Sequence, residues 1–197
     1  MPNRSTHTAA PAHVDMIARH LELLRIGLAN LRRREIEEIA RRLTIVRAGG
    51  SRAYVLGNGG SAAVAAHLAL GLSYDLARLK SQPIAALALD DAAFMSAVAN
   101  DLHAERVFLE QLSVRAQPGD LVIAFSASGK SPNVTAAIEW ARAHAVETVA
   151  IVGASGAVSE AADMPLILDC DDPGVAEDMF HVIAHLVVLA VAATGSN

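Results

Sequence analysis

Three side chains with acid–base or metal-binding chemistry recur at helical spacing near the carboxyl end of the chain. Glu177, His181 and His185 follow one another at intervals of four residues, which places them along one stripe of a helix. Imidazole exchanges protons near neutral pH, and imidazole and carboxylate groups are also common zinc ligands. The stripe therefore predicts an acid–base or metal site, to which His67 is a further candidate contributor. The alternative is that these histidines are satisfied core residues of a helix packed on a sheet.

A second candidate site is the loop 126–132 (SASGKSP), which combines three hydroxyl groups with the start of a helix. Ser131 followed by Pro132 is typical of the N-cap and first positions of a helix, where main-chain N–H groups lack partners. The hydroxyls of Ser126, Ser128 and Ser131 beside the positive end of a helix can hold a phosphate. The loop is not a nucleotide-binding P-loop, because the first glycine of G-x-x-x-x-G-K-[ST] is absent.

The loop 57–61 (GNGGS) is a third candidate, at the end of a short apolar run. Glycines such as Gly59 allow a ligand to approach main-chain N–H groups closely, and Asn58 and Ser61 add polar side chains. The loop does not match the dinucleotide fingerprint, because the third glycine of G-x-G-x-x-G is missing. The alternative interpretation is a turn that only requires a positive φ.

Strands and helices alternate along the chain and must position these residues. Short apolar runs bounded by glycine or polar turns predict strands, and apolar stripes with a helical period predict helices. The predicted strands are 53–56, 84–89, 121–125, 148–152 and 165–169. The predicted helices are 14–30, 33–48, 61–72, 92 onward, 104–114, 132–144, 158–162 and 175–193. This alternation predicts an α/β fold with helices on both faces of a parallel sheet and ligands at the carboxyl ends of the strands.

The composition excludes several classes of protein. The chain has 197 residues, of which 53% are hydrophobic and 4% aromatic, and this suits one compact domain and excludes an intrinsically disordered chain. A formal net charge of −5 argues against direct nucleic-acid binding. Cys170 is the only cysteine, so no internal disulfide can form.

The amino-terminal residues predict neither secretion nor membrane insertion. Residues 1–13 lack the apolar core of a secretory signal, and no uninterrupted apolar run reaches about 18 residues. We therefore expect a cytoplasmic protein with no membrane contact. Residues 1–13 are predicted to be a disordered tail, and residues 14–197 a single domain.

Taken in order, these motifs resemble the sugar isomerase (SIS) domain, and within it the phosphoheptose isomerases. The resemblance covers nearly the whole chain. It rests on the GNGGS loop, the alanine-rich helix with His67, the turn 99–101 (AND), the serine loop continued by Pro132-Asn133-Val134, and the histidine-bearing last helix. It implies an SIS-domain three-layer α/β/α sandwich with a central five-stranded parallel sheet, and N-terminal helices (residues 14–48) for oligomerisation.

The resemblance also implies a substrate site for a sugar phosphate. The phosphate is expected at the hydroxyls of Ser126, Ser128 and Ser131. The residues expected to line the sugar or approach it through the main chain are Asn58, Gly59, Ser61 and Asp101.

A zinc site is implied in the same way, with His67, Glu177 and His185 as its ligands. Three such ligands leave a fourth position open, as in catalytic zinc sites. The family has at one further position a glutamate that both binds metal and acts as catalytic base, and this position is Gly71 here. A sugar-contacting arginine of the family is replaced by Asp75. His185 is then the candidate catalytic base, but an imidazole bound to zinc cannot take protons, so the two roles are alternatives.

The implied activity is the isomerisation of sedoheptulose 7-phosphate, a ketose, to an aldose heptose 7-phosphate. The alternative is a non-catalytic SIS protein that binds a phosphosugar or associates with a replication initiator. Gly71 favours this alternative, whereas the presence of both His67 and His185 favours the enzyme. Either protein is expected to be a homotetramer with sites shared between subunits, associating through a helical face that contains Leu21, Leu23, Leu24 and Leu28.

Overall fold

The computed structural model describes residues 12–194, in which five parallel strands form one sheet. The strands are β1 (Arg52–Gly57), β2 (Ala85–Ala88), β3 (Leu121–Ser126), β4 (Glu147–Val152) and β5 (Met164–Ile167). Their order across the sheet is β2-β1-β3-β4-β5. Each predicted strand is present, so the prediction of a five-stranded parallel sheet is confirmed.

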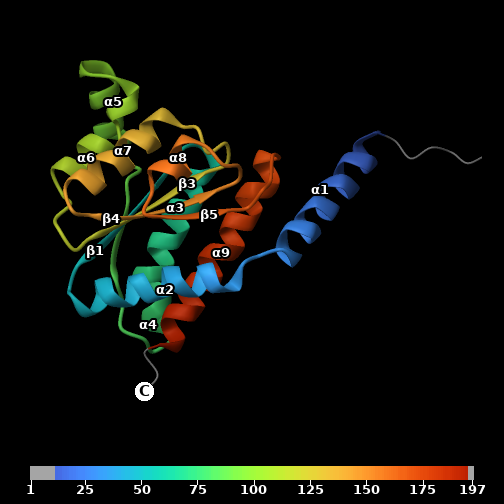
Figure 1. The fold of residues 1–197 in the computed structure, drawn as a ribbon, viewed down its shortest axis with the longest axis horizontal. Coiled ribbons are helices and arrows are strands. Elements are labelled where there is room, and N and C mark those ends of the chain that lie inside the picture. The colour runs from blue at the N-terminus through green and yellow to red at the C-terminus, as the bar shows by residue number, and fades with distance from the viewer. Residues whose placement is uncertain (1–11, 195–197) are drawn as a thin grey trace, which may run out of the picture.

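Helices cover both faces of this sheet. The helices are α1 (Ala12–Ala29), α2 (Arg33–Ala48), α3 (Gly60–Leu70), α4 (Leu76–Arg78), α5 (Ala92–Asp101), α6 (Leu109–Ser113), α7 (Pro132–Ala143), α8 (Ala157–Ala161) and α9 (Pro173–Ala193). Figure 1 shows α7 and α8 above the strands and α2, α3 and α9 below them. The α/β/α sandwich predicted from the sequence is therefore confirmed.

The core is divided into two hydrophobic clusters by the sheet, because successive side chains of a strand point to opposite faces. Val55 and Ile123 pack with α2, α3 and α9, whereas Tyr54 and Val122 pack with α6, α7 and α8. Residues of both clusters are almost completely buried. The strands are apolar on both faces, as expected for a parallel sheet between two helical layers.

The helical run after β1 is longer than the predicted helix 61–72. It continues from α3 through one π-helical turn, Gly71–Asp75, into α4. The hydroxyl of Ser73 donates to the main-chain oxygen of Ala69 at 2.7 Å, the acceptor that the N–H of residue 73 would take in a regular α-helix. Such back-bonding by a serine disturbs the regular hydrogen-bond ladder.

The predicted helix 104–114 is wrong as a single element. The chain forms a 3-10 turn, Ala104–Arg106, and then the short helix α6. The side-chain amide of Gln111 donates to the main-chain oxygens of Val107 (3.1 Å) and Leu89 (3.2 Å) between these pieces. The buried side chain of Gln111 thus connects α6 by a hydrogen bond to Leu89, directly after β2.

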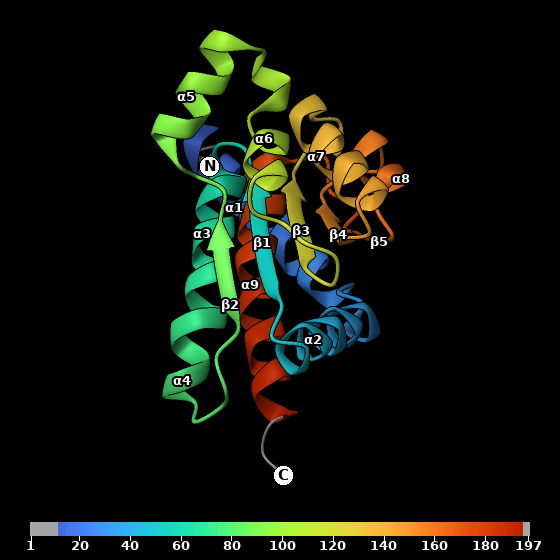
Figure 2. The same ribbon diagram turned by 90° about the vertical axis from the view of Figure 1, so that its left-hand side faces the viewer.

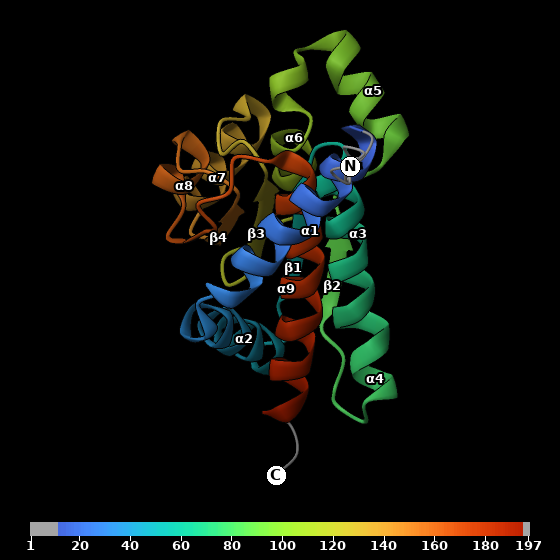
Figure 3. The same ribbon diagram turned by 90° about the vertical axis from the view of Figure 1, so that its right-hand side faces the viewer.

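Helix α1 lies across α9, as Figure 3 shows. His20 Nε2 lies 2.7 Å from a carboxylate oxygen of Asp178 on α9. Toward its amino end, α1 extends away from the rest of the molecule (Figure 1), and the side chains of Met16, Ile17 and Leu21 are 73%, 61% and 60% exposed. Most of the predicted tail, residues 1–11, lies outside the described residues, and residues 12 and 13 belong to α1.

Helix α9 is long and apolar enough to cross a membrane by length and composition, with a mean hydropathy of 1.8. Here it is a core helix, since Phe180, Ile183 and Val187 are fully buried against the sheet and α3. The carboxylate of Asp172 accepts hydrogen bonds from the N–H groups of Gly174 (3.0 Å) and Val175 (3.1 Å) and so caps the first turn.

Candidate functional site

The sheet has a topological switch point between β1 and β3. From β1 the chain passes to β2 on one side, and β3 then pairs with β1 on the other. In open α/β sheets, ligands bind outside the carboxyl ends of the strands at such a point. The loops 58–60 and 127–131 both leave the sheet there, at the end toward which the arrow of β2 points in Figure 2.

A small cavity of about 190 Å³ lies between these two loops. It is lined by Asn58, Ser61, Phe125, Ser126, Ala127, Ser128, Ser131, Pro173 and Glu177. The structure thus brings together five predicted substrate-binding residues, the four serines and Asn58. The lining contains hydroxyls and one carboxylate but neither lysine nor arginine, so an anion would be held there by hydroxyls and helix N-termini.

Ser131 occupies the N-cap position of α7, as predicted, but its hydroxyl makes no capping hydrogen bond. Instead its Oγ lies 3.2 Å from the Oγ of Ser126, which is 3% exposed. The Ser126 and Ser128 hydroxyls accept hydrogen bonds from the N–H groups of Gly129 and Lys130, each at 3.2 Å. The two hydroxyls fix the turn, and that of Ser131 faces the cavity.

The two loops are joined by a reciprocal pair of amides. Asn58 Nδ2 donates to Asn133 Oδ1, and Asn133 Nδ2 donates to Asn58 Oδ1, both at 2.9 Å. Gly59 is the N-cap of α3 with a positive φ of 55°, a conformation that favours glycine. The side chain of Asn58 is therefore hydrogen-bonded to Asn133, which follows loop 126–132. Asn133 was part of the predicted motif but was not predicted as a site residue, and here it helps to hold the two loops together.

Glu177 belongs to this cavity and not to the histidines. A Cβ on Gly60 would collide with the carboxylate of Glu177, so the missing side chain of Gly60 makes room for it. Gly60 is the first residue of α3, and a carboxylate is stabilised beside the positive end of a helix. The carboxylate therefore takes the α3 side of the cavity, and the three hydroxyls of loop 126–131 line the α7 side.

His67 on α3 and His185 on α9 form a pair in a second cavity. Their Nε2 atoms are 2.9 Å apart, within hydrogen-bond distance. The ring of His181 lies edge-on to that of His67, with centroids 5.3 Å apart. The cavity has a volume of about 460 Å³ and is lined by His67, Gly71, Asp75, Arg78, Leu79, His185, Val188 and Leu189.

The surroundings of His67 favour its neutral form. Burial lowers the pKa of His67 below its ordinary value, and positive charge on His185 or His181 acts in the same direction, while the negative charge of Asp75 opposes it. One imidazole of such a pair can donate the hydrogen bond while the other accepts it. The pair is therefore suited to hold and transfer a proton.

The predicted zinc site is not assembled by the described residues. Of the three expected ligands, His67 and His185 meet, but Glu177 lies in the serine cavity. Within residues 12–194, no group of three or more His, Cys, Asp or Glu side chains is close enough to hold a metal ion. Two imidazoles alone do not make the three-ligand set that catalytic zinc requires, so the donor set does not fit the ion.

Asp101 also lies apart from the other predicted site residues. It is the exposed last residue of α5, and its carboxylate accepts a hydrogen bond from the side chain of Asn100 at 2.8 Å. It lines neither of the two cavities. Its predicted contact with the sugar stays a prediction.

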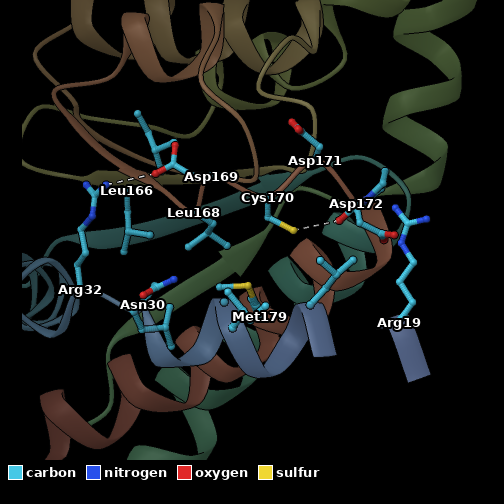
Figure 4. Close-up of a pocket in the computed structure, with 16 residues that line it drawn as sticks. Arg19, Asn30, Arg32, Leu166, Leu168, Asp169, Cys170, Asp171, Asp172 and Met179 are labelled. Atoms are coloured by element: carbon cyan, nitrogen blue, oxygen red, sulfur yellow. Dashed lines mark hydrogen bonds and ion pairs between the residues drawn. The ribbon is translucent and has the colours of Figure 1, made fainter. Parts of the chain in front are cut away.

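A third cavity, of about 620 Å³, lies between α1 and the segment 166–173 (Figure 4). It contains an ion pair between Arg32 and Asp169 at 3.5 Å, and the thiol of Cys170 donates to the main-chain oxygen of Asp172 at 3.5 Å. None of the predicted catalytic, substrate-binding or metal-binding residues lines this cavity.

The serine cavity and the histidine pair lie along the same two helices, α3 and α9, which pack side by side. Ser61 and His67 are six residues apart on α3, about 9 Å along the axis at 1.5 Å per residue. Glu177 and His185 are eight residues apart on α9, or about 12 Å. An extended molecule with an anionic group at the serines can thus reach toward the histidines.

Comparisons with known proteins show which family the chain resembles in sequence and fold. A family model for the SIS domain matches residues 17–153. A phosphoheptose isomerase of Solidesulfovibrio magneticus is 36% identical over 153 residues, 77% of this chain and 74% of that protein. A phosphoheptose isomerase of Akkermansia muciniphila is 37% identical over 155 residues, 78% and 82% of the two chains. The structure of a phosphoheptose isomerase from Francisella tularensis shares the fold, with a TM-score of 0.84, 24% identity and coverage of 93% and 100%.

Proposed function

This chain belongs to the SIS-domain family, with phosphoheptose isomerases among its relatives, and on that basis we propose that it is an aldose–ketose isomerase of a phosphosugar. The proposed reaction converts sedoheptulose 7-phosphate into an aldose heptose 7-phosphate. The observation that carries the proposal is that a pair of histidines at hydrogen-bond distance and a serine-lined cavity lie along the same two helices. The single unpaired Cys170 suits a reducing, cytoplasmic setting.

The serine cavity is the proposed phosphate site. The Ser131 hydroxyl and the amino end of α7 face it, and they can bind an anion without a basic side chain. The carboxylate of Glu177 would repel a phosphate on its own side, but it can accept hydrogen bonds from sugar hydroxyls. The phosphate is thus directed toward loop 126–131, and the sugar chain toward α3 and α9.

His185 is the proposed catalytic group. It is the more exposed member of the histidine pair and faces the open cavity. Isomerisation proceeds through an enediol, so protons must move at two adjacent carbons and at the oxygen that each of them carries. The His67–His185 pair can exchange protons with the two oxygens.

A coupled assay for aldose phosphate, with sedoheptulose 7-phosphate as substrate, tests the proposal. We expect turnover by the wild type, a loss of about 10²- to 10⁴-fold in kcat for His185→Ala, and a raised KM for Ser131→Ala. Ser113→Ala, which changes an exposed hydroxyl on α6 bound to its own helix, is the matched control and should be unchanged. Absence of product with and without added zinc contradicts the proposal.

The second candidate function is a non-catalytic sugar-phosphate-binding or replication-initiator-associating module. The observation that favours it is Gly71, which supplies no carboxylate to the histidine cavity. Calorimetry distinguishes the two candidates. Binding of sugar phosphate without turnover, or tight binding of an initiator without sugar-phosphate affinity, would favour the module.

We further propose that residues 14–197 act as one domain whose first two helices, residues 14–48, associate into a homotetramer with sites shared between subunits. Met16, Ile17 and Leu21 support this, because they leave apolar surface exposed on a helix that extends from the molecule. Exposed apolar patches of this kind are typical of protein–protein contacts.

A further inference from the structure

The cavity beside the histidine pair contains a carboxylate that the proposed function has not used. Asp75 lines this cavity together with His67, Gly71 and His185. The reaction proposed above needs a group that moves a proton between two carbons, in addition to the histidines that serve the oxygens. Asp75 carries the one carboxylate among the described residues that line this cavity.

Gly71 packs so closely on α9 that a larger residue at this position would collide with Val188. A Cβ on Gly71 would lie 2.8 Å from Cγ2 of Val188, and valine has little freedom to turn away. The same Cβ would lie 3.9 Å from Oδ2 of Asp75. The Asp75 carboxylate therefore lies beside the space in which a side chain of residue 71 would begin.

The local backbone explains how Asp75 reaches this space. His67, Gly71 and Asp75 are spaced by four residues, and side chains at such spacing stack on one face of a helix. Helical side chains also lean toward the amino end, so Asp75 extends back over Gly71 toward His67. The π-helical turn Gly71–Asp75 widens the helix at this place, and such turns are frequent at functional sites.

The charges near Asp75 leave one of its oxygens available. Oδ1 lies 3.8 Å from Nη1 of Arg78, whereas Oδ2 is the oxygen turned toward Gly71. The side chain is partly buried, at 36% exposure. One oxygen is thus oriented by a cation, and the other faces the cavity.

Resting on the proposed function, we propose that Asp75 is a second catalytic residue, the base that carries the proton between the two reacting carbons. Its carboxylate takes a proton from the hydroxyl-bearing carbon next to the carbonyl. The electron pair of that C–H bond forms the C=C bond of the enediol, while His185, the exposed member of the histidine pair, donates a proton to the carbonyl oxygen. The carboxylic acid then returns its proton to the other carbon, and the histidines recover theirs from the remaining hydroxyl. One carbon is oxidised and its neighbour reduced, so no external oxidant is needed.

The test measures kcat, KM and deuterium exchange for Asp75→Asn, Asp75→Glu and the matched control Glu139→Gln, which changes an exposed carboxylate on α7. We expect Asp75→Asn to lose about 10²- to 10⁴-fold in kcat with little change in KM. The exchange of the carbon-bound hydrogen with D2O, followed by NMR, should slow by the same factor. Asp75→Glu should recover part of the lost rate, and Glu139→Gln should match the wild type.

The outcomes separate this inference from the function on which it rests. An Asp75→Asn enzyme that keeps its kcat and its hydrogen exchange overturns the role of Asp75 while the isomerase stands. A rise in KM alone would make Asp75 a binding residue and equally overturns the inference. Wild-type protein without turnover overturns the proposed function and this inference together. The melting temperature of each variant, compared with that of the wild type, shows whether a lower kcat results from a loss of folded protein.

Discussion

At the scale of the residue, the geometry of α9 decides which of its polar side chains meet. Residues four apart on a helix differ in direction by about 40°, because each residue turns the helix by about 100°. Glu177 and His185, eight residues apart, therefore point about 80° away from one another and lie about 12 Å apart along the axis. For this reason Glu177 reaches the serine cavity while His185 pairs with His67.

The pKa of His67 makes stability depend on pH. Its folded-state pKa is lowered, chiefly by burial, so the unfolded chain takes up a proton more readily as the pH falls below about 6.5. The contribution of neutral His67 to the free energy of unfolding is fully present above the pKa of the unfolded state. It is lost as the pH falls through the pKa of the folded state. We expect the melting temperature of metal-free protein to fall between about pH 7.5 and 5.5.

His67→Gln is the control for this dependence, because it removes the titrating group and keeps a polar side chain. The variant should lose less stability than the wild type over the same range of pH. Parallel profiles of wild type and variant would show that His67 does not cause the change.

The sequence predicted the four serines and Asn58 of the serine cavity, but it assigned Glu177 to the histidines and not to this cavity. Loop 126–132 carries its own signals, a serine–proline helix start after a strand, so Ser126, Ser128 and Ser131 were found from local residues alone. Asp75 was predicted only as the replacement of a sugar-contacting arginine, because no local motif shows that its carboxylate lies beside Gly71. The stripe His67, Gly71, Asp75 was the signal that could have identified it.

At the scale of the element, the close approach of two helices determines what residue 71 can be. The π-helical turn after α3 packs on α9, and Gly71 contacts Val188 there with no room for a Cβ. The strands and most helices were predictable, because glycines and prolines mark their ends and apolar residues repeat with clear periods. The π-turn was not predictable from this pattern, since the spacing of apolar residues does not distinguish one π-helical turn from a regular α-helix.

The contact between Gly71 and Val188 predicts a strong coupling between two substitutions. Gly71→Ala gains about 1 kcal/mol of helix propensity but incurs overpacking that typically costs about 1–3 kcal/mol, so in the wild type it should be neutral or destabilising. In a Val188→Ala background the collision is gone, and the same substitution should be stabilising. Urea unfolding of the four proteins measures the coupling, and equal effects in both backgrounds would contradict the close contact.

At the scale of the whole molecule, α1 is the helix that extends from the rest of the chain and leaves apolar side chains exposed. It contacts α9 through its carboxyl-terminal half but exposes apolar side chains at its other end. Sequence periodicity identified this helix, because its apolar residues repeat at helical spacing. Its exposed apolar side chains make association between chains the property to measure in solution.

Light scattering of the purified protein tests the proposed tetramer. Four chains of 20.6 kDa give 4 × 20.6 = 82.4 kDa, and we expect this mass for the wild type. Ile17→Asp combined with Leu21→Asp should lower the mass, because burying two carboxylates in an apolar contact is unfavourable. Asp15→Asn, at an exposed position of the same helix, should leave it unchanged. A monomeric wild type would contradict the proposal.

Helix α9 follows α2 and α3, which it contacts, by a long stretch of chain, and this order has a consequence for synthesis on the ribosome. This helix supplies nine buried residues and packs against α2 and α3, which are made more than a hundred residues earlier. Until it emerges, α2 and α3 alone cover one apolar face of the sheet, and apolar surface left exposed in this way promotes aggregation of nascent chains. Premature termination anywhere before residue 173 should therefore yield insoluble chains and not a smaller folded protein. Helix α9 thus completes both this side of the core and, through His185, the histidine pair.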